Sequence, residues 1–392
     1  MNPLKKRVIP ILITLLMSAI APVPPMAAAY ETDAPYDGYI VKLKNPESAM
    51  RLFAVGSALS NAEYAGHGLY AVQTEEEAFA LADYAEYIEP NYILTLFGTY
   101  SYTDYAAQDN ITMTNAEGLW TYDHFGTGIK VGVIDSGVSP HNALAANLLE
   151  GYNYLDKNRE TADSIGHGTR VAGTLAAQYG FEVIGAAHNA KIVPLKCFGE
   201  KGGSMLDVVQ AIYDGVDLYG CDVLNMSFGI ENIDISTISE AVEYAASLGV
   251  VMVAAAGNNG DNTLCYPAAY PSVIGVGSVE KSGNTVIKSS FSNYNKSVFV
   301  TAPGRNTKSL SASSKTAYSI DSGTSYAAPV VAGFAANVLS ADPSLRTGDA
   351  RTVDLMKFII ADTAVDLGAA GCDDYFGYGM IDGGKIKAAL VS

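Results

Sequence analysis

The sequence predicts an α/β fold built on a parallel, doubly wound sheet. After about residue 108, short and nearly continuous apolar runs alternate with longer stretches that carry apolar residues at helical spacing. Strands that are buried on both faces and joined by helices are typical of such sheets. The predicted strands cover residues 130–134, 191–195, 221–225, 249–253 and 272–276, and the predicted helices cover 169–178, 205–218, 237–248, 326–339 and 351–360.

The composition is that of a folded protein with a large core. Of the 392 residues, 49% are hydrophobic and 17% are charged, which excludes disordered and collagen-like chains. Lys and Arg total 24 against 41 Asp and Glu, so the net charge of -17 has the wrong sign for binding a phosphate backbone. We therefore expect no nucleic-acid partner.

Residues 1–29 have the features of a secretory signal peptide. A basic start at residues 5–7 precedes an apolar run from 8 to about 21, and the three alanines at 27–29 fit a cleavage site. The alternative is a membrane anchor, but the run contains Pro10 and is shorter than the roughly 18 residues that span a bilayer. We expect a secreted, extracellular protein with no membrane anchor.

A small α+β module follows the signal. We expect strands at 39–44 and 69–73, helices at 48–55 and 75–87, and a further extended piece at 88–96. A stretch rich in Tyr, Thr and Ser, residues 95–108, lacks periodicity and is expected to be an exposed linker. The expected organisation is a signal at 1–29, the small module at 30–105 and the main domain at 106–392.

Four polar side chains are expected at one edge of the predicted sheet. Asp135 ends a strand, His167 opens a helix between two glycines, Asn258 follows a buried strand, and Ser325 lies in the first turn of the longest apolar helix. Ligands bind at the carboxyl ends of parallel strands, so this edge is where a reaction would occur. Taken alone, each residue is more often a turn or cap residue. Together they supply a nucleophile, its base, an orienting carboxylate and an oxyanion donor.

At these residues the sequence resembles the subtilisin-like serine proteases, or subtilases. The likeness is carried by Asp-Ser-Gly at 135–137, Gly-His-Gly-Thr at 166–169 and Gly-Thr-Ser at 323–325, and it extends through 225–229, 253–258 and 266–274. The resemblance implies a subtilisin-like peptidase domain in which Asp135, His167 and Ser325 are the catalytic triad and Asn258 is the oxyanion donor. It also implies that the module at 30–105 is a ferredoxin-like propeptide that acts as inhibitor and intramolecular chaperone.

The resemblance further implies a substrate groove. An extended peptide would lie between residues 202–204 and 227–229 and pair its backbone as an added strand. The pocket for the residue before the cleaved bond would have Cys265 at its floor, which favours a medium to large apolar residue; alternatively, Cys265 is only a small buried hydrophobe. The implied substrate-binding residues are Gly202, Gly203, Ser204, Ser227, Phe228, Gly229, Ala254, Ala255, Ala256, Gly257 and Cys265.

The sequence departs from the family pattern at two motif positions and at a metal site. Arg170 stands where the family has a second histidine, and Tyr326 stands where a methionine follows the nucleophile. Ala143 replaces an aspartate that binds calcium in several subtilisins, and the loop at 178–183 lacks the usual ligands. We therefore expect no metal or other cofactor there. The acidic pair at 373–374 could bind a hard cation, but such a pair is more often a solvated face.

Three functions are compatible with these features. The first is a secreted serine endopeptidase made as a self-processing zymogen, with protein or peptide substrates and its own propeptide as inhibitor. The others are a dedicated processing protease for one secreted precursor and a catalytically silent binding protein, which the intact set of four residues disfavours. A monomer is expected. The cysteines allow two disulfides with three pairings, one disulfide or none, and the other histidines show no metal-ligand spacing; these residues are Cys197, Cys221, Cys265 and Cys372, and His67, His124, His141 and His188.

If calcium does not stabilise the protein, a chelator should leave its stability almost unchanged. We expect EDTA to shift the melting temperature by less than about 2 °C, because less than about 0.5 kcal/mol of folding free energy would be lost. Differential scanning calorimetry with and without the chelator measures the shift, and added calcium is the control. A large drop that calcium reverses would show that a calcium site exists.

Overall fold

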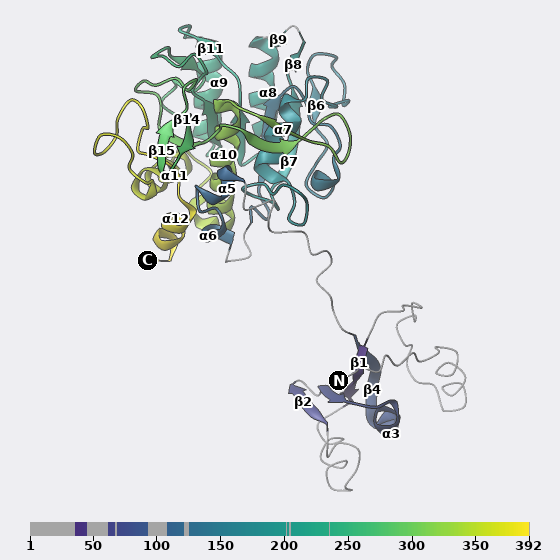
Figure 1. The fold of residues 1–392 in the computed structure, drawn as a ribbon. Coiled ribbons are helices and arrows are strands. Elements are labelled where there is room, and N and C mark those ends of the chain that lie inside the picture. Colours follow the sequence, from purple (N-terminus) through teal and green to yellow (C-terminus); the bar gives the residue numbers. More distant parts are fainter. Residues whose placement is uncertain are drawn as a thin grey trace. The chain divides into compact units, whose positions relative to one another are not determined.

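The structure is a computed structural model that describes residues 36–44, 62–66, 69–92, 108–120, 125–200, 202–203, 205–234 and 236–391. The chain divides into two compact units, residues 1–99 and 100–392. Figure 1 shows the ribbon, with the helices and several strands of the larger unit labelled. That unit carries all four of the polar residues that the sequence singles out.

The larger unit is built on one eight-stranded sheet. Its strand order is β15-β14-β12-β10-β5-β7-β6, and β16 also pairs with β14. Seven of these strands run parallel, and only β15 is antiparallel. The strands are β5 (Lys130–Asp135), β6 (Tyr152–Asn153), β7 (Lys191–Lys196), β10 (Val223–Met226), β12 (Val251–Ala255), β14 (Val273–Ser282), β15 (Thr285–Lys288) and β16 (Val300–Pro303).

The strand order reverses at β5. From β5 the chain passes through the edge strand β6 to β7, which pairs with β5 on one side, and then crosses to the opposite side of β5, where β10, β12 and β14 follow one another. In an open parallel sheet, the two connections leave opposite sides at such a point and open a crevice at the carboxyl ends of the strands. Asp135, the last residue of β5, therefore stands at the position where this architecture places a ligand.

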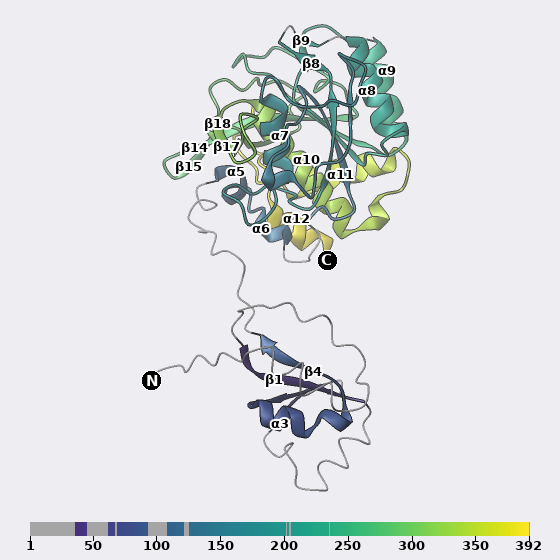
Figure 2. The same ribbon diagram turned by 90° about the vertical axis from the view of Figure 1, so that its right-hand side faces the viewer.

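Helices cover both faces of the sheet, as Figure 2 shows. Alternate residues of each strand contribute to two separate cores, because successive side chains point to opposite faces. In β12, for example, Val251 and Val253 belong to one core and Met252 and Ala254 to the other. The first core packs against α7 (His167–Ala176) and α10 (Thr324–Ala341), and the second packs against α8 (Met205–Asp217) and α9 (Ser236–Ser247). The prediction of a sheet wound on both faces is confirmed for this unit.

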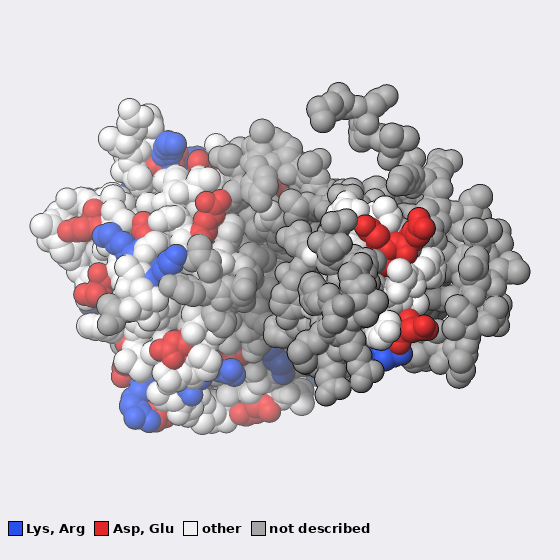
Figure 3. All heavy atoms as spheres, turned by 90° about the horizontal axis from the view of Figure 1, so that it is seen from below, with Lys and Arg blue, Asp and Glu red and all other residues white. Residues whose placement is uncertain are grey.

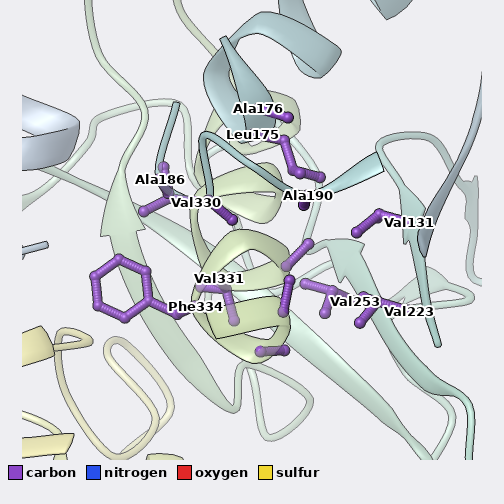
Figure 4. Close-up of a cluster of buried hydrophobic side chains, with 14 of the residues drawn as sticks. Val131, Leu175, Ala176, Ala186, Ala190, Val223, Val253, Val330, Val331 and Phe334 are labelled. Carbon is purple, nitrogen blue, oxygen red and sulfur yellow. The ribbon is translucent and has the colours of Figure 1, made fainter. Parts of the chain in front are cut away.

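The helix α10 lies in the middle of the first core. It has 18 residues, and almost all of them are buried, so it has no polar face. Figure 4 shows Val330, Val331 and Phe334 of this helix among Val131 and Val253 of the sheet. A helix that is apolar on every side is stable only inside a core, and this requirement fixes where both of its ends lie.

The predicted helices are present with small differences at their ends. α7 begins two residues earlier than expected because Gly166, with a φ of 91°, takes the left-handed conformation and caps it. α10 extends two residues further at each end, and α11 (Arg351–Thr363) extends three further at its carboxyl end. The sequence did not predict α5 (Asp109–Thr112), α6 (Glu117–Trp120), α12 (Gly383–Leu390), the strands β6, β15 and β16, or the short pairs β8 (Phe198–Gly199) with β9 (Gly202–Gly203), β11 (Ile230–Glu231) with β13 (Cys265–Tyr266), and β17 (Thr307–Leu310) with β18 (Tyr318–Asp321).

The smaller unit contains a four-stranded antiparallel sheet in the order β2-β3-β1-β4. Its elements are β1 (Tyr36–Leu43), β2 (Glu63–Gly66), β3 (Leu69–Val72), α3 (Glu75–Ala80) and β4 (Ala85–Tyr92). The helix predicted at 75–87 is too long. A Thr74 capping box starts α3, but the chain leaves the helix after Ala80 because the later residues pair with β1. The helix predicted at 48–55 lies outside the described residues.

No described cysteine forms a disulfide. Cys197, Cys221 and Cys265 are buried and Cys372 is exposed, all as free thiols. None of the helices that the structure describes is long and apolar enough to cross a bilayer. On the part of the larger unit that Figure 3 shows, acidic and basic side chains are interspersed.

One buried histidine links the fold to pH. His188 is stacked on Phe125 with ring centroids 4.4 Å apart, and it meets Trp120 in an edge-to-face arrangement with ring centroids 5.1 Å apart. Its Nδ1 is buried without a hydrogen-bond partner. Burial among these apolar groups disfavours the charged ring and lowers the pKa of His188 from 6.5 to about 4.

We expect His188 to make the folded state less stable in acid. The unfolded chain binds a proton here more tightly than the native one, so stability is intact above pH 7 and falls as the pH drops from about 6.5 to 4. Between these pH values, the free energy of unfolding of His188→Phe should fall by about 2–3 kcal/mol less than that of the protein with His188. Urea unfolding in a Ser325→Ala background measures the difference, and parallel pH profiles for the two proteins would contradict it.

Candidate active site

Asp135 and His167 form a hydrogen-bonded pair at the carboxyl edge of the sheet. The Nδ1 of His167 lies 2.8 Å from one carboxylate oxygen of Asp135 and 3.0 Å from the other. The carboxylate is buried, with 4% of its side chain exposed, whereas 28% of the imidazole is exposed. Burial alone lowers the pKa of His167, but the charge and the hydrogen bond of Asp135 outweigh it, so the pKa lies above its ordinary value. This pairing leaves Nε2 as the nitrogen available for proton transfer.

A close backbone approach makes the pairing possible. His167 is the first residue of α7, and Gly168 follows it. A Cβ on Gly168 would lie 2.2 Å from the carbonyl oxygen of Gly137 and 3.1 Å from Asp135. Only glycine lets the helix start approach the turn after β5 this closely. The glycine after the histidine is therefore a packing requirement of the pair.

A buried carboxylate, Asp163, fixes the two segments relative to each other. It accepts hydrogen bonds from the backbone N–H groups of Ile165, Gly166 and Thr169 and from the hydroxyls of Ser136 and Thr169, at 2.7 to 3.0 Å. It thus caps the N-terminus of α7, where a negative charge is favourable, and ties it to the residue after Asp135. The sequence analysis missed this residue, although an aspartate three residues before the Gly166 cap is a recognisable capping signal.

Ser325 is held by a reciprocal pair of hydrogen bonds with Ser227. The Ser325 hydroxyl donates to the Ser227 carbonyl at 3.0 Å, and the Ser227 hydroxyl donates to the Ser325 carbonyl at 2.8 Å. The second bond has a local cause: Pro329, four residues on, has no N–H to offer that carbonyl. Asn225 in turn donates to the Ser227 hydroxyl at 2.9 Å. The Ser325 hydroxyl thus donates its hydrogen bond to the Ser227 carbonyl and not to His167. Catalytic hydrogen bonds often tighten only when substrate is bound.

The side chain of Asn258 is oriented by the start of α10. Its Oδ1 accepts from both the backbone N–H and the hydroxyl of Thr324, each at 2.9 Å. Because the carbonyl end is fixed in this way, the NH2 end must face the opposite direction. The N–H of Ser325 belongs to the first turn of α10, whose N–H groups have no partners within the helix. The Asn258 NH2 group and the Ser325 backbone N–H are thus two hydrogen-bond donors on adjoining segments that could serve a bound ligand.

The predicted groove residues gather on two segments. Phe198 contacts both segments. The centroid of its ring is 4.9 Å from that of Phe228, and a Cβ built on Gly203 would lie 2.6 Å from the Phe198 ring. Cys265 lies 2.2 Å from a Cβ built on Gly229 and 3.4 Å from one built on Gly257. Cys265, the predicted pocket floor, therefore lies against Gly229 and Gly257, which are both among the implied substrate-binding residues. Ser204 lies outside the described residues, and Ala254, Ala255 and Ala256 are buried at the end of β12.

The part of the chain that the structure describes contains no cluster of three or more His, Cys, Asp or Glu side chains arranged to hold a metal ion. Two of the remaining histidines have structural contacts. His141 accepts a hydrogen bond from the N–H of Ala143 and so caps a short 3-10 turn, and His188 lies in the aromatic cluster described above. His67 and His124 lie outside the described residues.

The comparison with protein families decides the identity of the fold. Residues 126–379, more than half of the chain, match the family described as "Subtilase family". The chain belongs to the subtilase family. It is accordingly a subtilisin-like serine endopeptidase, and its substrates are proteins.

Individual subtilases show how far the similarity extends. A thermophilic serine proteinase of Bacillus sp. (strain AK1) is 35% identical over 76% of this chain and 71% of its own length. The minor extracellular protease Epr of Bacillus subtilis is 34% identical over 71% of this chain, which spans only 41% of that longer protein. Among solved structures, one titled "Crystal Structure of a Lanthipeptide Protease" has a TM-score of 0.63 and 28% identity, over 76% of this chain and all of the other.

Removal of the Asp163 carboxylate should destabilise the protein, because this side chain joins the segments that carry Asp135 and His167. We expect Asp163→Ala to lower the free energy of unfolding by about 2–4 kcal/mol, because five donors lose a buried charged acceptor. Asp366→Ala is the matched control, since this exposed carboxylate accepts one backbone hydrogen bond, and it should cost less than about 1 kcal/mol. Denaturant unfolding of both variants is the measurement, and equal losses would contradict the anchoring role.

Proposed function

We propose that this subtilase hydrolyses peptide bonds through Asp135, His167 and Ser325, with Asn258 as an oxyanion donor. The observation that carries the proposal is the buried Asp135 carboxylate bonded to Nδ1 of His167 at 2.8 Å. That bond fixes the tautomer of the imidazole, directs Nε2 outward and stabilises the ring once it is protonated. Ser325 follows the family motif onto the start of α10, whose N-terminus faces the same edge of the sheet.

The reaction requires one rotamer change in the free enzyme. Ser325 must leave the Ser227 carbonyl and turn its hydroxyl toward Nε2 of His167. As Oγ bonds to the substrate carbonyl carbon, its proton passes to Nε2 and the carbonyl electrons become an oxyanion. The Nδ2 of Asn258 and the N–H of Ser325 then donate to that oxyanion. The carbonyl then re-forms as the C–N bond breaks, and His167 gives its proton to the leaving amine, so the acyl group stays on Ser325. Water attacks this acyl-enzyme in the same way, with His167 first taking the proton of the water and then giving it to Ser325 Oγ.

The substrate is proposed to lie extended between residues 202–204 and 227–229. This placement is supported by Phe198, which lies against both Gly203 and Phe228. Burial, and to a smaller extent Glu231, raises the pKa of the Cys265 thiol to about 11, so the proposed pocket floor is uncharged at neutral pH. An uncharged floor suits a medium to large apolar side chain, and residues 227–229 and 254–257 would form the walls of this pocket.

Secretion and self-processing are part of the same proposal. Residues 1–29 have the pattern of a signal peptide, and one relative is itself named an extracellular protease. Residues 30–105 would be a ferredoxin-like propeptide, which the four-stranded antiparallel sheet with one helix supports. The peptidase domain would then comprise residues 106–392 and act as a monomer without a cofactor.

A narrower function is the second candidate. The solved structure titled "Crystal Structure of a Lanthipeptide Protease" is covered over its whole length by this chain. By analogy, this protein could process one secreted precursor instead of degrading proteins in general. Once the chain has matured, a general endopeptidase would digest casein, whereas a dedicated processing protease would not.

Ser325→Ala should abolish both hydrolysis and maturation. We expect wild-type residues 30–392 to lose a fragment ending between about 96 and 109 and to digest casein, whereas the variant keeps its full mass and cleaves nothing. Intact-mass measurement beside a casein assay tests both outcomes. Cleavage that persists in the purified variant would overturn the nucleophile assignment, and a mature enzyme that ignores casein would favour the processing function.

Asn258→Ala should act mainly on the transition state. We expect kcat to fall by about a hundredfold or more with little change in KM, because the oxyanion loses the Nδ2 donor and the first turn of α10 loses the Oδ1 acceptor, while neither group is proposed to bind the ground-state substrate. Steady-state kinetics on a peptide substrate separates the two constants. A rise in KM with kcat preserved would show instead that Asn258 binds the substrate.

A further inference from the structure

The two departures from the family motifs contact each other beside His167. Tyr326, which follows Ser325, accepts a hydrogen bond from Nε of Arg170 at 3.0 Å and donates one to Asp321 at 2.9 Å. The Arg170 guanidinium also lies 3.3 Å from the same Asp321 carboxylate. The three side chains therefore form a closed unit in which each contacts the other two.

This unit lies directly against the imidazole. The rings of Tyr326 and His167 have centroids 5.5 Å apart and are tilted by 44°. Tyr326 is 3% exposed, and both hydrogen bonds of its hydroxyl hold the ring in one orientation. Arg170 stands three residues after His167 on α7, so the two side chains lie on the same side of the helix.

We propose that Arg170, Tyr326 and Asp321 form a positioning unit for His167. In this unit Tyr326 holds the imidazole in place, and the Arg170–Asp321 pair sets how readily the ring is protonated. This inference rests on the proposed role of His167 and adds three residues to it. None of the three touches the reacting atoms by itself, so each acts through His167.

The charges around the His167 imidazole support the proposal that the Arg170–Asp321 pair sets how readily it is protonated. Asp135 of β5 and Asp163 before α7 favour the protonated imidazole, whereas Arg170 of α7 opposes it and lowers the pKa of His167. Asp321 of β18 neutralises part of the Arg170 charge, and the Tyr326 hydroxyl of α10 lies between them. Burial raises the pKa of Tyr326 above its ordinary value, so the hydroxyl stays neutral and can donate to Asp321.

The two charged members should therefore have opposite effects when neutralised. Arg170→Gln removes a repelling cation and should raise the titration midpoint of His167 by about half a pH unit, whereas Asp321→Asn exposes the ring to the full cation and should lower it. Tyr326→Phe keeps the ring and both charges, so it should leave the midpoint nearly unchanged. The midpoint is read by NMR of labelled histidine in the full chain carrying Ser325→Ala, and the His167 signal is assigned by its loss in His167→Gln.

Kinetics tests the positioning part in the active enzyme. Tyr326→Phe should lower kcat by about threefold to tenfold at unchanged KM. The aromatic ring at position 326 loses both hydrogen bonds that orient it, so it holds the His167 imidazole less firmly. Arg170→Gln should move the acidic limb of the kcat/KM profile upward in pH, in step with the NMR midpoint. The matched controls are Tyr244→Phe, which removes another tyrosine-to-aspartate hydrogen bond, and Arg346→Gln, which removes another arginine–aspartate pair; both should behave as wild type.

The outcomes separate the unit from the proposed function. Shifts in the same direction, or none, for Arg170→Gln and Asp321→Asn would overturn the electrostatic role, and a kcat within twofold of wild type for Tyr326→Phe would overturn the positioning role. The NMR midpoints do not depend on hydrolysis. Opposite shifts in a protein whose wild type cleaves nothing would therefore uphold the unit while the proposed protease function fails.

Discussion

The position of α10 is the constraint on which the rest of the site depends. The helix has no polar face, so its only stable location is the core between the sheet and α7. Its N-terminus then has to emerge at the edge where β5, β10 and β12 end. Four contacts made by the other segments are directed at that first turn: Ser227 on Ser325, Asn258 on Thr324, and Asp321 and Arg170 on Tyr326.

The proline within α10 shows how strongly the helix and the site are coupled. Pro329 leaves the carbonyl of Ser325 without its usual helical donor, and the vacancy is filled by a side chain from the turn after β10. The same turn supplies a carbonyl to the Ser325 hydroxyl. The helical hydrogen bond that Pro329 cannot make is thus replaced by one between Ser227 and Ser325, which lie about a hundred residues apart in the chain.

The site is preorganised mainly by acceptors that are fixed before any substrate arrives. Asp163 gathers donors from the start of α7 and from the turn after Asp135, and the Thr324 N–H and hydroxyl fix the amide of Asn258. Dipoles held in this way need no reorganisation during the proposed reaction. The replacement of two motif residues by Arg170 and Tyr326 fits this pattern, because a single polar residue there would leave a buried donor or acceptor unpaired.

The sequence by itself determined the alternation of apolar strands and helices, the parallel sheet and the four residues at its carboxyl edge, because these depend on local periodicity and on motifs of adjacent residues. It also located Arg170 and Tyr326 as departures from the motifs. Only the tertiary structure showed that these two residues form a hydrogen bond with each other and that Asp163 joins the start of α7 to the turn after β5. It alone also showed that Ser227 donates to the Ser325 carbonyl, which Pro329 leaves without a helical donor. Each of those contacts joins residues that are distant in sequence, and no periodicity records which buried donor will meet which acceptor when the chain folds. The same reason explains the helix that ended early at Ala80, where pairing with β1 outweighed the helical pattern of the following residues.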